Sequence, residues 1–257
     1  MEYELNSKVI LVVGGTSGIG LATARAFASA GATVVVASRN SGKGVAAIEE
    51  LASLGANAAF FECDVSNASS VTRLLDSILL QFGTLDCAVN CAAYDFKPAK
   101  AHEVPDREVA KHLAVDVRGL FSCMRAEIVA MLRSKGGTIV NIASTTGLSG
   151  TPTAALYSAG KHAVIGLTRS TAKEYIGDGI RINAVCPGVT ITPRRERRAA
   201  HLSKAEQSEQ DQALAREIPI GRPAAANEIA NAVIWLSSPL SSYVVGHSLV
   251  IDGGLTA

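Results

Sequence analysis

The chain has 257 residues and a formal net charge of +1, from 24 lysines and arginines against 23 aspartates and glutamates. This near-neutral balance favours neither nucleic acid nor an anionic membrane as a partner. Apolar residues make up 48% of the chain, no apolar run approaches eighteen residues, and the start lacks a signal-peptide pattern. The five cysteines have no metal-ligand spacing, so we expect reduced thiols in a cytoplasmic protein and no metal site.

Apolar runs that indicate strands alternate along the whole chain with segments that indicate helices. This alternation is typical of an α/β fold, a doubly wound parallel sheet of about seven strands with helices on both faces. The absence of a Pro- or Ser-rich linker predicts a single domain over residues 1–257. The predicted strands are Val9–Val13, Thr33–Ala37, Ala58–Glu62, Cys87–Asn90, Thr138–Ala143, Arg181–Val185 and Ser248–Ile251. The predicted helices are Gly18–Ser29, Ser41–Leu54, Ala68–Phe82, Val109–Arg133, Leu156–Ile176 and Asn227–Ser237.

A glycine-rich turn joins the first predicted strand to the first predicted helix. It contains Gly14, Gly18 and Gly20, which allow a tight turn, close approach of a ligand to the backbone, and close packing of helix on strand. Because backbone N–H groups are free at a helix N-terminus, the turn predicts a site for a dinucleotide diphosphate. The residues assigned to it are Gly14, Thr16, Ser17, Gly18, Ile19 and Gly20.

A serine, a tyrosine and a lysine carry the predicted chemistry. Tyr157 and Lys161 are four residues apart, so on a helix they lie on the same face. An adjacent positive charge favours phenolate over phenol and makes proton exchange at neutral pH easier. Ser144 follows a predicted strand, where an α/β sheet places its reactive groups. The three side chains predict a proton-transfer site.

With these motifs in place, the chain resembles the short-chain dehydrogenase/reductase family from about residue 7 to residue 254. Besides the glycine turn and the Ser144, Tyr157, Lys161 set, the family's Asp-Val pair matches Asp64-Val65, and its Asn-Asn-Ala-Gly corresponds to Asn90-Cys-Ala-Ala. The resemblance implies a Rossmann-type sheet, hydride transfer between nicotinamide and a small carbonyl or secondary alcohol, and a homotetramer built on the two longest helices. The further cofactor-binding residues that it implies are Asp64, Val65, Asn90, Ala92, Tyr157, Lys161, Pro187, Gly188, Thr190 and Thr192.

One departure from the family pattern lies at Asp116, where the family has a catalytic asparagine. Asp116 keeps the backbone carbonyl and the side-chain size but adds a potential negative charge. A carboxylate beside Lys161 would stabilise the ammonium and could also screen it from Tyr157. A tolerated substitution without consequence is the alternative. We include Asp116 among the catalytic candidates.

The end of the second predicted strand carries the cofactor preference. An acidic residue there would bind ribose hydroxyls and repel a 2′-phosphate, but the chain has Ser38, Arg39 and Asn40. A guanidinium can grip a phosphate with two hydrogen bonds. The sequence therefore predicts NADP(H) in preference to NAD(H).

The resemblance implies that the segment at about 190–217 forms a helical lid over the substrate. Its basic start contains Arg194 and Arg195, which either face solvent or meet an anionic group of the substrate. By their positions after two strands, Tyr94, Phe96, Leu148, Gly150 and Thr151 are expected to line the substrate pocket.

Two other functions fit the same motifs. A 3-ketoacyl reductase acting on a carrier-bound chain would need a basic surface for the carrier, and Asp178 lies where such family members tend to have arginine. A non-catalytic dinucleotide-sensing protein would not need Ser144, Tyr157 and Lys161 together.

Overall fold

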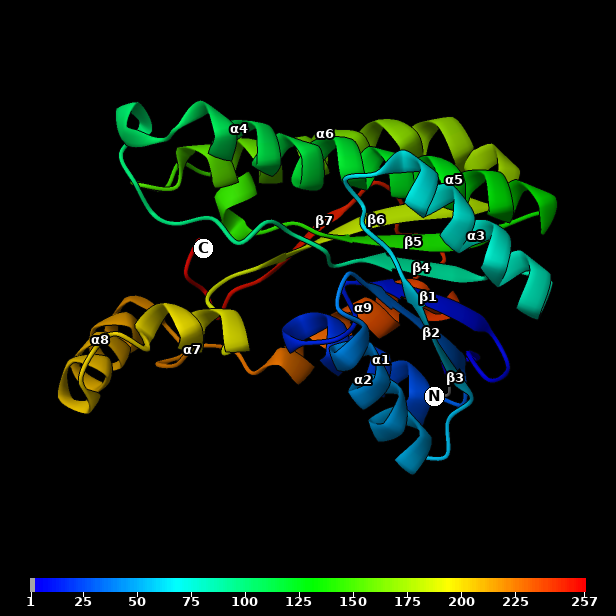
Figure 1. Cartoon of the computed structure of the whole chain (residues 1–257), viewed down its shortest axis with the longest axis horizontal. Coiled ribbons are helices and arrows are strands. Elements are labelled where there is room, and N and C mark those ends of the chain that lie inside the picture. The colour runs from blue at the N-terminus through cyan, green and yellow to red at the C-terminus, as the bar shows by residue number, and fades with distance from the viewer. Residues whose placement is uncertain (1–2) are drawn as a thin grey trace.

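The computed structural model describes residues 3–257 and contains a parallel sheet of seven strands in the order β3-β2-β1-β4-β5-β6-β7. The central strands are buried along their whole length because helices cover both faces of the sheet (Figure 1). The strands are β1 Val9–Val13, β2 Thr33–Ser38, β3 Ala58–Glu62, β4 Cys87–Asn90, β5 Gly137–Ile142, β6 Ile180–Pro187 and β7 Ser248–Ile251. The predicted fold class is confirmed.

Two helical layers enclose the sheet. In Figure 1, α3, α5 and α6 lie on one side of the strands, and α1, α2 and α9 lie on the other. Each layer packs on its own apolar cluster, because successive residues of a strand point to opposite faces. The bounds of these helices are α1 Gly18–Ser29, α2 Ser41–Ser53, α3 Ala68–Phe82, α5 Leu120–Arg133, α6 Ala155–Tyr175 and α9 Ala226–Ser237.

The strand order reverses between β1 and β4, which are neighbours in the sheet but not in the sequence. The chain winds outward on one side of this point through β2 and β3, and on the other through β5, β6 and β7. The loops that follow β1 and β4 therefore diverge and leave a crevice at the carboxyl ends of the strands. The predicted glycine turn follows β1 and the predicted reactive serine, Ser144, follows β5 at this edge.

The predicted helix Val109–Arg133 is not one α-helix. The structure has α4 Asp106–His112, a π-helical segment Leu113–Gly119, and then α5. A π-helical turn accommodates more backbone per turn than an α-helix, so it shifts the side chains around the helix axis. Apolar periodicity cannot predict this local change. Asp116 lies within the π-helical segment, so the change affects the direction in which its side chain points.

The segment 190–217 contains two helices, α7 Pro193–Ala199 and α8 Lys204–Glu217, which extend beyond the carboxyl edge of the sheet (Figure 1). Thr192 caps α7 by accepting a hydrogen bond from the backbone N–H of Arg195, and Ser203 caps α8 in the same way through Glu206. Neither helix has a buried residue. Across residues 3–257, we find no helix with the length and apolar character that crossing a membrane requires.

Candidate active site

A cleft of about 860 Å³ lies at the carboxyl edge of the sheet and brings most of the predicted site residues together. They lie at or after the carboxyl ends of six strands, β1 to β6, so the sheet topology and not sequence proximity assembles them. The predicted residues that line the cleft are Gly14, Thr16, Ser17, Gly18, Ile19, Ser38, Arg39, Asn40, Val65, Ala92, Ser144, Tyr157, Lys161, Pro187, Gly188, Thr190 and Thr192.

The glycine turn has the shape that a dinucleotide diphosphate requires. Gly14 and Gly18 have φ angles of +82° and +54°, where glycine is favoured. A β-carbon on Gly20 would lie 2.2 Å from the carbonyl oxygen of Gly14, so helix and strand could not pack as they do. The side chain of Ser17, which precedes α1, makes no capping hydrogen bond, and the first N–H groups of the helix face the cleft without a side-chain partner. These features fit the phosphates of a bound dinucleotide.

Four predicted site residues do not line the cleft. Gly20 lies below it at the helix–strand contact. The Asp64 carboxylate accepts hydrogen bonds from the Ser66 N–H and hydroxyl, at 3.0 and 2.7 Å, and so shapes its own loop. The Asn90 side chain is buried and Asp116 points away from the cleft into the helices. We infer that Asn90 and Asp64 support the backbone around the cleft, while Val65 and Ala92 face it.

The hydroxyl of Ser144 has one hydrogen-bond donor that no group among residues 3–257 uses. Its Oγ accepts from the Thr146 N–H at 3.2 Å and from the Thr146 hydroxyl at 2.8 Å. A hydroxyl has two acceptor positions and one donor, so the donor remains for a ligand oxygen. The serine lies two residues after the end of β5 and caps a 3₁₀ turn, Thr145–Gly147, and it lines the cleft.

Lys161 lies on α6 one turn beyond Tyr157, as the spacing predicted. Its ammonium donates a hydrogen bond to the Ile142 carbonyl oxygen at 2.7 Å and lies 5.6 Å from the centroid of the Tyr157 ring. The side chain is almost fully buried, so solvent screens its charge weakly. An ammonium has three donors, so two are left for other acceptors in the cleft.

The phenol ring of Tyr157 is held by a second aromatic ring. The Phe96 ring stacks on it with centroids 4.6 Å apart and an interplanar angle of 20°. Phe96 was expected in the substrate pocket, but it lies behind the tyrosine and does not line the cleft. The other four residues expected there, Tyr94, Leu148, Gly150 and Thr151, also do not line it.

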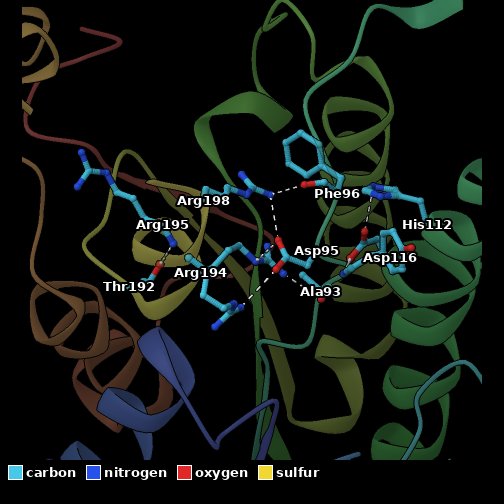
Figure 2. A network of polar contacts seen from close by, with 11 residues as sticks. Ala93, Asp95, Phe96, His112, Asp116, Thr192, Arg194, Arg195 and Arg198 are labelled. Atoms are coloured by element: carbon cyan, nitrogen blue, oxygen red, sulfur yellow. Dashed lines mark hydrogen bonds and ion pairs between the residues drawn. The ribbon is translucent and has the colours of Figure 1, made fainter. Parts of the chain in front are cut away.

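Asp116 has a partner to which the sequence analysis gave no role. Its Oδ2 atom lies 2.9 Å from Nε2 of His112, and both side chains are 1% exposed. The contact is close enough for an ion pair, although its angle is outside the hydrogen-bond range. The other oxygen, Oδ1, accepts from the backbone N–H of Tyr94 at 3.0 Å. Figure 2 shows this pair beside Phe96. Among residues 3–257, Asp116 makes no ion pair with Lys161.

His112 and Lys43 are the site residues that sequence reasoning missed. His112 and Asp116 have the four-residue spacing of neighbours on a helix, and this was the available signal. The His112 ring also contacts the edges of the Tyr94, Phe96 and Tyr157 rings. Lys43 lines the cleft in the first turn of α2, beside Arg39.

We expect Asp116→Asn to leave the pH–rate profile unchanged and to alter kcat/KM by less than about threefold. The reason is that the Asp116 side chain contacts His112 and the Tyr94 N–H and not Lys161, while asparagine keeps an oxygen to accept from the Tyr94 N–H. The measurement is kcat/KM across pH 5–9. The contrasting variant, His112→Gln, leaves a buried carboxylate without its imidazole and should destabilise the fold in urea. A displaced limb of the profile in Asp116→Asn would contradict this assignment.

In the part of the chain that the structure describes, no group of three or more His, Cys, Asp or Glu side chains is arranged to hold a metal ion. The cysteines at Cys63, Cys87, Cys123 and Cys186 are buried and free. Burial raises the pKa of the Cys87 and Cys186 thiols to about 11, so both remain neutral.

Comparisons with known proteins cover nearly the whole chain. A family model described as enoyl-(acyl carrier protein) reductase matches residues 13–256. An A-factor type gamma-butyrolactone 1′-reductase (1S-forming) of Streptomyces virginiae is 40% identical over 98% of this chain and 96% of its own. A 2,5-dichloro-2,5-cyclohexadiene-1,4-diol dehydrogenase of Sphingobium indicum is 39% identical over 99% of both. Among crystal structures, a variant of actinorhodin polyketide ketoreductase with NADPH has a TM-score of 0.92 at 34% identity, over 97% of both chains.

Proposed function

We propose the following function for this chain, which belongs to the short-chain dehydrogenase/reductase family and is an oxidoreductase of alcohol or carbonyl groups. It works with NADP(H) on small substrates through Ser144, Tyr157 and Lys161. One observation carries the proposal. The three side chains line one cleft, and Ser144 and Lys161 keep hydrogen-bond donors that no neighbouring residue uses.

The nicotinamide supplies or accepts the hydride when the cofactor is bound. In reduction, Tyr157 donates its phenolic proton to the substrate oxygen, and in oxidation it takes that proton back. Ser144 donates a hydrogen bond to the same oxygen and holds it near the phenol. The Lys161 ammonium stabilises the phenolate and binds ribose hydroxyls. Thr192, which lines the cleft beside Gly18, would bind the carboxamide of the nicotinamide.

The preference for NADP(H) is supported by the charge at the adenosine end of the cleft. Ser38, Arg39 and Lys43 line this end, and both cations are exposed there. No carboxylate from residues 3–257 lines the cleft at this end. A 2′-phosphate bound at this end would lie near two cations and would not be repelled by a carboxylate. The similar ketoreductase crystallised with NADPH is consistent with the same preference.

We expect Arg39→Asp to reverse the preference. The substitution removes the guanidinium and adds a carboxylate, which repels the 2′-phosphate. The ratio of kcat/KM for NADPH to that for NADH should therefore change by roughly 100-fold. The measurement is initial rates with both cofactors at one ionic strength. Arg216→Asp, which makes the same charge change outside the cleft, should leave the ratio as in the wild type. Equal or better turnover of NADH by the wild type would refute the proposal.

The first experiment is consumption of NADPH by the purified protein against a panel of ketones and aldehydes. No consumption with any member would argue against a small carbonyl substrate. The second candidate, a carrier-bound ketoacyl chain, is favoured by the description of the matching family model and by the similarity to a polyketide ketoreductase. The panel therefore includes a ketoacyl pantetheine thioester, and faster turnover of the thioester than of its free ketone would favour that candidate.

The proposal includes a cytoplasmic homotetramer with α5 and α6 in one interface. Exposed apolar side chains on α5 support such an interface, namely Phe121, Val129 and Leu132, each between 41% and 48% exposed. A monomeric mass in solution by light scattering would contradict it.

A further inference from the structure

Positive charge is concentrated in the cleft of this nearly neutral protein. Of the charged side chains among residues 3–257, seven cations and one carboxylate line it. Arg39, Lys43 and Lys161 face the proposed cofactor. Four more, Arg194, Arg195, Arg197 and Arg198, belong to α7 and are called the α7 arginines here. A cleft with charge of one sign attracts ligands of the opposite sign.

Asp95 is the one carboxylate among these lining residues, and three of the α7 arginines share it (Figure 2). Its Oδ1 lies 3.3 Å from Arg194 Nε and 3.2 Å from an Arg198 terminal nitrogen, and its Oδ2 lies 3.3 Å from Arg197. One negative charge against three positive charges leaves an excess of two. Each guanidinium has five N–H donors, so most donors of Arg197 remain for another oxyanion. Arg195 pairs separately with Asp211 of α8.

Arg198 is connected to Tyr157 through one ring. Its guanidinium carbon lies 4.4 Å from the centroid of the Phe96 ring, and it donates to the Phe96 carbonyl oxygen at 2.7 Å. The same ring stacks on the ring of Tyr157. A cation of α7 and the phenol ring of Tyr157 therefore contact the same aromatic side chain, and both residues line the cleft.

We propose that the preferred substrates are oxo- or hydroxycarboxylates, whose carboxylate is bound by Arg197 and Arg198 while the oxo or hydroxyl oxygen lies at Ser144 and Tyr157. This inference rests on the proposed function and adds the substrate class. Asp95 acts as the counter-ion of the arginines and competes with the substrate carboxylate. A planar carboxylate accepts two hydrogen bonds from a guanidinium, which a neutral ester cannot match.

The test compares 4-oxocyclohexanecarboxylate with its methyl ester, which has the same ketone and no charge. We expect the wild type to prefer the acid by about 10- to 100-fold in kcat/KM, mainly through KM, because a hydrogen bond to a charged group has this worth. Arg197→Gln should lower the acid-to-ester ratio by about 10-fold, and Asp95→Asn should raise it, because it removes the competing carboxylate. Arg216→Gln, on α8 outside the cleft, should have the ratio of the wild type.

A second measurement does not depend on turnover. Calorimetry of the protein with NADP⁺ should detect tighter binding of cyclohexanecarboxylate than of cyclohexanecarboxamide, and Arg197→Gln should abolish the difference. Equal binding of the two compounds would overturn the inference, as would an acid-to-ester ratio near one. Turnover of the ester with no preference for the acid would leave the proposed function intact and reject only the substrate class.

Discussion

Replacing Tyr157 by phenylalanine is expected to lower kcat by about 10²- to 10⁴-fold, the usual contribution of a positioned general acid. The substitution removes only the phenolic oxygen. The ring keeps its stacking contact with Phe96 and its place near the Lys161 ammonium, so the cleft should retain its shape. Affinity for NADP⁺, measured by calorimetry, should therefore stay close to that of the wild type.

The matched control is Tyr175→Phe, the same chemical change on the same helix. Tyr175 packs against the core at the far end of α6 and does not line the cleft. It should keep full activity. Turnover by Tyr157→Phe within a few fold of the wild type would end the assignment of proton transfer to this tyrosine.

The second large effect is expected in stability, at a carboxyl below the cleft. Glu127 on α5 is fully buried, and burial raises its pKa from 4.5 to about 7, against a smaller opposing effect of the hydrogen bond from Asn90. Asn90 Nδ2 lies 2.9 Å from Glu127 Oε2 and 3.0 Å from Asn141 Oδ1, whereas Glu127 Oε1 has no partner among the described residues. A neutral carboxyl costs less to bury than a charged one.

Because the folded pKa of Glu127 lies above the unfolded value, its contribution to stability is fully present below pH 4.5 and is lost as the pH rises through 7. We expect the free energy of unfolding to fall by about 2 to 3 kcal/mol between pH 5 and pH 8 from this group alone. Glu127→Gln, which cannot ionise, should lack that loss. Urea unfolding of both proteins at four pH values gives the difference.

The control for this experiment is Glu174→Gln on α6, where the side chain is exposed. Its pH dependence should follow that of the wild type. If Glu127→Gln and the wild type lose stability in parallel from pH 5 to pH 8, the carboxyl is ionised in the folded protein throughout that range, and the assignment of a neutral Glu127 is wrong.

How much the sequence could predict depends on the range of each interaction. Apolar runs and glycine positions predicted all seven strands and the turn at Gly14, because burial and backbone conformation there depend on residues that are close in the sequence. The spacing of Tyr157 and Lys161 predicted their shared helix face for the same reason. A break in helix type at Leu113–Gly119 left no periodic signal, so the direction of Asp116 could not be predicted.

The amino-acid sequence by itself determined the sheet, the glycine-rich turn after β1 and the three side chains proposed for chemistry. Only the tertiary structure decided that Arg198 meets Asp95, 103 residues earlier, that Phe96 contacts both that arginine and Tyr157, and that Glu127 reaches Asn90 in the core. The physical reason is that such contacts depend on which loops the strand order places side by side. Residue spacing along the chain does not indicate the strand order when about a hundred residues separate the two partners of a contact.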